Sequence, residues 1–198
     1  MARIDPEFLA QAISRVEAEL KICAEATSKP VLFLISGLPG TGKSFLSRRL
    51  AARISCVIVE TDLIRKVISP SPTYTPKENE CVYAICHALI RDLLMRGYRV
   101  VFDATNLIER NREILYHIAD QVGAKLVIIR TVASEEAIRQ RIANRKAGTD
   151  PQDRSEAGWT VHQKMRAVQE RIGRNHLVID TTQEIDSAVE KILRLARN

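Results

Sequence analysis

The chain has 198 residues, of which 45% are hydrophobic and 27% charged, a composition that is ordinary for one soluble globular domain over residues 1–198. No apolar run reaches the roughly 20 residues of a membrane span, so we expect no membrane partner. Lys and Arg outnumber Asp and Glu by 30 to 24, and the net charge of +6 suits a phosphate-bearing ligand, either a nucleotide or a nucleic acid.

The beginning of the chain and its cysteines predict a cytoplasmic protein. Acidic residues between Asp5 and Glu19 interrupt any apolar leader segment. None of the four cysteines belongs to a Cys-x-x-Cys pair, which favours reduced thiols over disulfides or a zinc site. Apolar residues at helical spacing predict an amphipathic helix from about Glu7 to Ala26, within an N-terminal extension over residues 1–28.

An apolar strand, Val31–Ser36, leads directly into the pattern Gly-x-x-x-x-Gly-Lys-Ser. Glycines let such a loop turn its backbone N–H groups onto phosphates. Lys43 supplies a cation for the β- and γ-phosphates, and the Ser44 hydroxyl is a candidate Mg²⁺ ligand. A helix predicted from Lys43 to Ala52 points the positive end of its dipole at the same anion. The residues predicted to bind ATP are Gly37, Leu38, Pro39, Gly40, Thr41, Gly42, Lys43, Ser44 and Phe45.

The second predicted strand, Cys56–Glu60, is followed by Asp62 and Arg65. Open α/β sheets place their ligands at the carboxyl ends of the strands. If a helix begins here, both side chains project from its first turn, so that Asp62 can receive a hydroxyl while Arg65 holds an anionic group. The alternative is that Asp62 only caps the helix.

The third predicted strand, Arg99–Asp103, is reached through a loop and a long helix. The segment Ser69–Lys77 is predicted to be a loop, because its prolines disfavour a helix or a central strand. A helix is predicted over Asn79–Arg96. Asp103 closes the strand as a candidate for binding Mg²⁺ or substrate, with helix capping as the alternative, and Asn106 follows it.

The fourth predicted strand, Lys125–Thr131, precedes a helix from about Ser134 that carries several arginines. Arg141 and Arg145 are four residues apart and share a face, whereas Arg139 lies on another. This pair enters a polar, Gly-containing loop, so residues 139–160 are predicted to form a small helical lid that brings guanidinium groups over phosphates. The alternative is a solvated face with ion pairs to glutamates.

The last strand is predicted at His176–Asp180, and the last helix near Thr182, with a capping box formed by Thr181 and Glu184. Asp180 is more simply a helix cap than a site residue. Because strands and helices alternate, we predict the α/β class and the P-loop NTPase fold: a parallel five-stranded sheet sandwiched by helices, with a small helical lid and an extra N-terminal helix.

From Val31 to Arg174 the chain resembles the P-loop kinase group that contains polynucleotide 5′-hydroxyl kinases, zeta-type toxins and chloramphenicol phosphotransferases. The resemblance rests on the Gly-rich loop, on Asp62-Leu-Ile-Arg65, on Asp103-Ala-Thr-Asn106 and on the two lid arginines. It implies that Asp62 is the general base, that Arg65 binds a phosphate of the acceptor, that Asp103 acts near Mg²⁺, and that Arg141 and Arg145 clamp the donor phosphates. Arg110 and Arg112 are weaker candidates.

The chain departs from that group in having Phe45 where a second hydroxyl residue is common, and in lacking an Asp-x-Asp phosphatase motif. Three hypotheses remain open. The first is an ATP- and Mg²⁺-dependent transfer of the γ-phosphate to a hydroxyl acceptor, with a polynucleotide 5′-OH as first choice. The second is a kinase of a small molecule such as a nucleotide sugar, an antibiotic or a metabolite. The third is an ATP-binding switch module without an acceptor.

Overall fold

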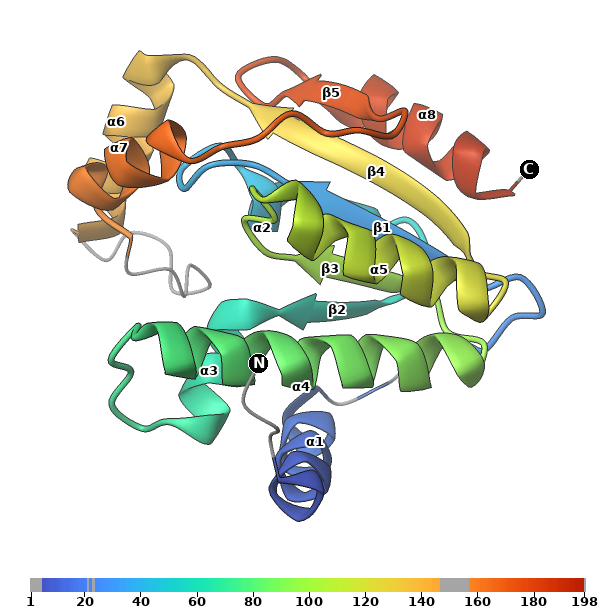
Figure 1. Ribbon diagram of the computed structural model, residues 1–198. Helices are drawn as coiled ribbons and strands as arrows, with labels where there is room; N and C mark the ends of the chain where they lie inside the picture. The colour runs from blue at the N-terminus through green and yellow to red at the C-terminus, as the bar shows by residue number, and fades with distance from the viewer. Residues whose placement is uncertain (1–4, 21, 23, 147–156, 198) are drawn as a thin grey trace.

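The computed structural model of the chain describes residues 5–20, 22, 24–146 and 157–197 and contains one parallel five-stranded sheet (Figure 1). The strand order is β2-β3-β1-β4-β5, and every neighbouring pair is parallel. The strands are β1 (Val31–Ser36), β2 (Val57–Glu60), β3 (Val100–Asp103), β4 (Lys125–Val132) and β5 (Leu177–Asp180). The α/β class, the five strands and their sandwich of helices are therefore confirmed.

Helices cover both faces of the sheet. In the described residues they are α1 (Pro6–Leu20), α2 (Lys43–Ala51), α3 (Thr61–Ile68), α4 (Pro76–Met95), α5 (Glu109–Gln121), α6 (Glu135–Lys146), α7 (Trp159–Ala167) and α8 (Asp186–Arg197). Side chains of β1 alternate between the two cores: Leu32 and Leu34 pack with α4 and α5, whereas Phe33 and Ile35 pack with α2 and α8. This two-sided burial explains the uninterrupted apolar run of β1.

The N-terminal helix α1 is shorter than predicted, since it ends at Leu20 and the described residues between Ile22 and Pro30 are not helical. Its buried side chains, Ala12 and Val16, join the core that contains α4. The helix packs mainly against α3 and α4 and lies at the outside of that layer (Figure 1). It therefore adds to the helical layer beside the edge strand β2.

Two predicted helix starts are wrong. Helix α4 begins at Pro76 rather than Asn79, because proline is tolerated at the first helical position and the Thr75 side chain caps the turn by accepting from the Glu78 N–H at 3.3 Å. Helix α8 begins only at Asp186, so the predicted capping box does not form. The Thr182 N–H and hydroxyl instead donate to the Asp180 carboxylate.

Among the described residues, no helix is both long enough and apolar enough to cross a membrane.

Candidate active site

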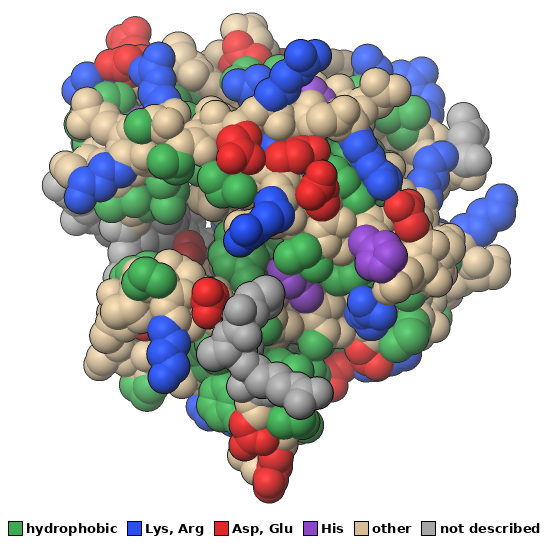
Figure 2. All heavy atoms as spheres, in the orientation of Figure 1, with side chains coloured by type: hydrophobic (Ala, Val, Ile, Leu, Met, Phe, Trp, Pro, Cys, Tyr) green, Lys and Arg blue, Asp and Glu red, His purple; other side chains and the backbone are tan. Residues whose placement is uncertain are grey.

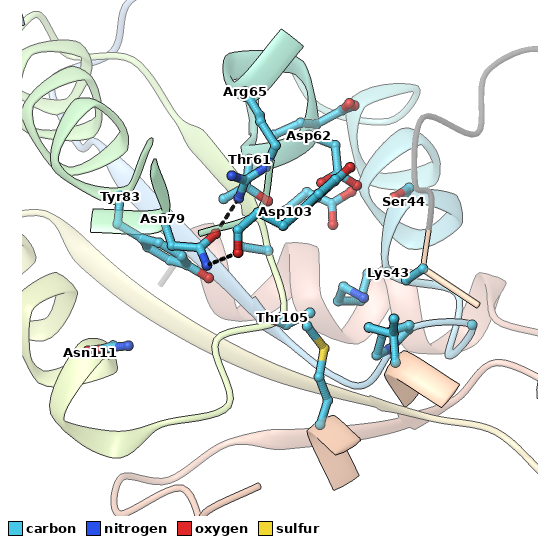
Figure 3. A pocket seen from close by; sticks show the side chains of 18 of the residues that line it. Lys43, Ser44, Thr61, Asp62, Arg65, Asn79, Tyr83, Asp103, Thr105 and Asn111 are labelled. Atoms are coloured by element: carbon cyan, nitrogen blue, oxygen red, sulfur yellow. Dashed lines mark hydrogen bonds between the residues drawn. The ribbon is translucent and has the colours of Figure 1, made fainter. Parts of the chain in front are cut away.

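The carboxyl ends of β1, β2 and β3 open into a cleft of about 1960 Å³. In the space-filling view the molecule is indented on one side, between the lobe of α6 and α7 and the loop that joins α3 to α4 (Figure 2). Figure 3 looks into the cleft: Asp62 and Asp103 lie between Arg65 on one side and Ser44 and Lys43 on the other. Most of the site residues predicted from the sequence therefore line this one cleft.

The loop of residues 37–44, the P-loop, has the shape of an anion cradle in this structure. Gly40 and Gly42 have φ angles of 84° and 83°, in the left-handed region that favours glycine, and Gly42 is the N-cap residue of helix α2. Thr41 Oγ1 donates to the Leu38 carbonyl at 2.8 Å, and Lys43 Nζ donates to the same carbonyl at 3.2 Å. The loop geometry fits ATP, since the backbone turns where phosphate oxygens need N–H donors and a helix N-terminus lies behind.

Residues from distant elements support the P-loop from outside. Arg141 donates to the Gly40 carbonyl at 3.2 Å and to the Thr181 side chain and carbonyl at 2.8 Å each. The Thr181 hydroxyl in turn donates to the Thr41 carbonyl at 2.9 Å. Burial lowers the pKa of the Arg141 guanidinium. Arg141 therefore lines the cleft as predicted, but in this arrangement its donors hold the P-loop to the end of β5.

Helix α7 adds a further support that sequence reasoning missed. His162 is buried, and its Nδ1 lies 2.8 Å from the Pro39 carbonyl oxygen of the P-loop. Its ring stacks on Trp159, with centroids 4.9 Å apart and planes at 7°, and the Arg139 guanidinium carbon lies 3.9 Å from the centre of the Trp159 ring. An isolated histidine in a basic segment carries no signal for this role.

Two carboxylates face the phosphate end of the cleft. Asp103 is buried and accepts a hydrogen bond from Ser47 Oγ at 3.1 Å. Asp62 lies in the first turn of α3; burial raises its pKa, the charge of Lys43 opposes that rise, and the charge of Asp103 adds to it. A desolvated carboxylate beside a second carboxylate and a lysine is an effective proton acceptor, and oxygen ligands suit Mg²⁺. Ser44 and Asp103 are the candidates for holding that ion.

Arg65 lines the same cleft but is only 5% exposed, because neighbouring side chains enclose it. Its guanidinium donates to Glu78 Oε1 at 2.5 Å and to Asn79 Oδ1 at 2.7 Å, and it lies 4.7 Å from the centre of the Tyr74 ring. Figure 3 shows the bond from Arg65 to Asn79. Arg65 shares the cleft with Asp62, as predicted, and it already has an anionic partner.

Arg145, the second arginine of the predicted lid, also lines the cleft and donates to the Ala157 carbonyl at 2.9 Å. Arg139 faces elsewhere and pairs with Glu135 at 2.8 Å, as its position on the helix predicted. Of the predicted lid over residues 139–160, positions 147–156 lie outside the described residues.

Asn106 and Arg112 lie beneath the cleft rather than in it. Asn106 is buried, with φ of 46°, and its Nδ2 donates to the Ile35 carbonyl of β1 at 2.7 Å. Arg112 is fully buried and donates to the carbonyls of Asn106 and Arg171. Both residues tie loops to the sheet, whereas Arg110 lines the cleft.

Helix α4 contributes a wall of the cleft that sequence reasoning missed. Asn79, Tyr83 and His87 recur every four residues along α4 and line the cleft together. Burial raises the pKa of the Tyr83 hydroxyl and lowers the pKa of His87 to about 4, so that both side chains are neutral at pH 7. The spacing of these three polar residues was the feature of the sequence that could have identified this wall.

Several known proteins are similar to this chain in sequence or in fold. An uncharacterized protein of Mycobacterium tuberculosis is 28% identical over 155 residues, which are 72% of this chain but only 31% of that protein. The APS kinase CysC of Mycobacterium tuberculosis, solved with AMPPNP and APS, superposes with a TM-score of 0.64 at 13% identity, covering 87% of this chain and 100% of that chain. A gluconokinase from Sinorhizobium meliloti 1021 superposes with a TM-score of 0.60 at 20% identity, covering 85% of this chain and 92% of that chain.

These structural likenesses show that the fold is that of the P-loop kinase group. Residues 32–172, from β1 to beyond α7, match the AAA domain family. Because this match covers most of the chain and includes the P-loop, both carboxylates and the arginines of α6, the chain belongs to that family of P-loop, kinase-like domains.

Proposed function

We propose that the protein is an ATP- and Mg²⁺-dependent phosphotransferase that moves the γ-phosphate to a hydroxyl group of a small molecule. The observation that carries the proposal is the shared cleft, in which Asp62 and Asp103 face the P-loop residues Lys43 and Ser44. A switch module without an acceptor predicts Asp62 and Arg65 far from Lys43, yet all three line this one cleft.

In the proposed reaction, the P-loop N–H groups and Lys43 hold the β- and γ-phosphates of ATP. Asp62 takes the proton of the acceptor hydroxyl. The acceptor oxygen then bonds to the γ-phosphorus as the bond between that phosphorus and the β–γ bridging oxygen breaks, and this oxygen leaves with ADP. Burial of Asp62 supports this role, because the raised pKa makes the carboxylate a better base. Ser44 and Asp103 would hold Mg²⁺, which supplies neutralisation of phosphate charge.

The acceptor end of the cleft favours a small molecule. Its wall from α4 and α5 presents four uncharged hydrogen-bonding groups, Asn79, Tyr83, His87 and Asn111, together with one carboxylate, Glu80, and one cation, Arg110. The APS kinase and the gluconokinase act on small acceptors according to their names, which supports the same class here.

The competing acceptor is a polynucleotide 5′-OH, which the net charge of +6 favours. On the face seen in Figure 2, however, Lys and Arg side chains are interspersed with Asp and Glu. A nucleic acid is bound best by a continuous basic surface, so this face gives the competing acceptor little support.

The test is transfer of labelled γ-phosphate to a panel of sugars, polyols, nucleosides and a 5′-OH oligonucleotide. We expect label on a small acceptor, and Asp62→Asn to lower kcat by about 10²–10⁴-fold with ATP affinity unchanged. The matched control is Asp92→Asn, the same change on an exposed residue paired with Arg96, which should keep full activity. Equal losses of kcat and ATP affinity would remove Asp62 as the base, and label on the oligonucleotide alone would identify the competing acceptor.

A further inference from the structure

The Arg65 guanidinium is enclosed at the acceptor end of the cleft. The side chains of Arg65 and Glu78 are only 6% and 12% exposed, and their nitrogen and oxygen atoms are 2.5 Å apart. Asn79 occupies a second nitrogen and the Tyr74 ring covers one face of the guanidinium, while Nε is buried without a hydrogen-bond partner. An incoming anion would therefore have to displace side chains before it could reach this cation.

The carboxylate of Glu78 is held in place from its other side as well. Its Oε2 accepts from the Thr73 N–H at 2.7 Å and from the Thr73 hydroxyl at 2.6 Å. These bonds and the bond from Arg65 lower the pKa of Glu78 to about 2, so the carboxylate stays charged at neutral pH. Asn79 Nδ2 also donates to the Tyr74 carbonyl at 3.4 Å. Loop 69–75 and the first turn of α4 thus fix Glu78 against Arg65.

The charge balance of this corner decides what it can bind. Arg65 alone would attract a phosphate beside the attacking hydroxyl, but the Glu78 carboxylate cancels its charge and repels a second anion. Of the other α4 residues that line the cleft, Asn79, Tyr83 and His87 offer uncharged hydrogen bonds, and Glu80 adds a second carboxylate rather than a cation. Displacing Glu78 would also break its hydrogen bonds with Arg65 and Thr73, which is unfavourable.

We propose that Glu78 is a specificity-determining residue: by occupying Arg65, it excludes acceptors that carry a phosphate next to the reacting hydroxyl and selects uncharged hydroxyl compounds. The inference rests on the proposed phosphotransferase function and names the substrate class of that site. A purely structural Glu78 would hold loop 69–75 in place without affecting the choice between charged and uncharged acceptors.

The experiment compares adenosine with adenosine 3′-monophosphate, two probes that share a free 5′-OH and differ by one phosphate. Binding is measured by calorimetry with the ATP site saturated by Mg²⁺ and AMPPNP. We expect the wild-type protein to bind the phosphorylated probe no better than adenosine. Glu78→Gln keeps the size of the side chain and one acceptor oxygen but removes the negative charge that cancels the charge of Arg65. It should therefore improve affinity for the phosphorylated probe by about tenfold without improving affinity for adenosine.

The matched control is Glu80→Gln, which removes the same charge from an exposed carboxylate of α4 that also lines the cleft. It should give no preference for the phosphorylated probe. The double variant Glu78→Gln/Arg65→Gln should lose the gain, because the freed cation is then absent. Thermal unfolding of each variant and its AMPPNP affinity check that the fold and the P-loop are intact.

Two outcomes overturn the inference: tighter binding of the phosphorylated probe by the wild-type protein, or an unchanged probe preference in Glu78→Gln. The wild-type measurement decides even if a variant does not fold. Failure of the phosphotransferase function would look different, since label transfer would then be absent from every acceptor while the binding differences remained. Failure of the inference leaves transfer intact and removes the binding differences.

Discussion

At the scale of single residues, the burial of Asp62 has opposite effects on the stability of the fold and on the proposed chemistry. Its carboxylate is desolvated at the start of α3, and Asp103 adds a second negative charge nearby. Both effects disfavour the ionised form, and Lys43 offsets them only in part, because the pKa is raised in sum. A raised pKa in the folded state means that ionised Asp62 destabilises the fold, although the same raised pKa would make its carboxylate a stronger base in the proposed reaction.

We therefore expect Asp62→Asn to stabilise the ligand-free protein. The unfavourable charge is fully present above the raised folded pKa and absent below the ordinary value of 3.8. The gain in unfolding free energy should thus be largest at pH 8 and should shrink as the pH falls toward 4. Urea unfolding at both pH values measures it. Asp120→Asn is a control with the opposite expected effect. Arg174 lowers the pKa of Asp120, so removing that charge should decrease the unfolding free energy at pH 8. Destabilisation by Asp62→Asn at pH 8 would refute the argument.

At the scale of elements, α1 is part of the fold because its apolar stripe is buried against other helices. Val16 is fully buried in the core shared with α4, whereas the adjacent Glu17 faces solvent and pairs with Arg96 at 2.6 Å. Arg15 also donates to the Val67 carbonyl of α3. The apolar contacts are expected to dominate, since exposed ion pairs contribute at most about 1 kcal/mol.

Val16→Ala should accordingly lower the free energy of unfolding by about 2 kcal/mol, because it removes two buried methyl groups and leaves a cavity. Glu17→Gln on the next residue should change it by less than about 0.5 kcal/mol. Chemical denaturation of both variants provides the comparison. A larger effect from Glu17 than from Val16 would mean that charge, rather than burial, attaches α1 to the domain.

At the scale of the whole molecule, the cleft lies where distant parts of the chain meet. The P-loop follows β1, Asp62 follows β2, Asp103 ends β3, and α6 and α7 supply the wall beside the P-loop. A ligand held by all of these segments binds only the folded state, so it must stabilise the entire domain.

Mg²⁺ with AMPPNP should therefore raise the free energy of unfolding by about 2.7 kcal/mol when the ligand is at a hundred times its Kd. Removing the metal with EDTA should reduce the shift, because Ser44 and Asp103 would then lack the ion that offsets phosphate charge. Lys43→Ala should weaken it further, while Lys191→Ala on α8 serves as the matched control. The midpoint of thermal unfolding reports each case, and an equal shift in Lys43→Ala and wild-type protein would contradict the assignment of the P-loop.

Much of the fold could be predicted because its signals are local. Each strand was located within one residue at either end, since short β-branched runs between polar breaks leave few alternatives. Helix ends were less accurate: α1 stops at Leu20, and α8 starts at Asp186 rather than Thr182. Apolar spacing continues past the point where neighbouring elements cease to cover a helix, so spacing alone does not locate the last turn.

The sequence by itself determined the phosphate-binding loop, the parallel sheet and the placing of Asp62 and Asp103 at strand ends, because each depends on residues adjacent in the chain. Only the tertiary structure decided the partners of the other polar groups. Arg65 meets Glu78 from 13 residues away, Arg141 meets Thr181 from 40, and Asn106 meets Ile35 from 71. A side chain of given chemistry serves a ligand or the fold according to which groups packing brings beside it, and that depends on how helices and strands distant in the chain pack together.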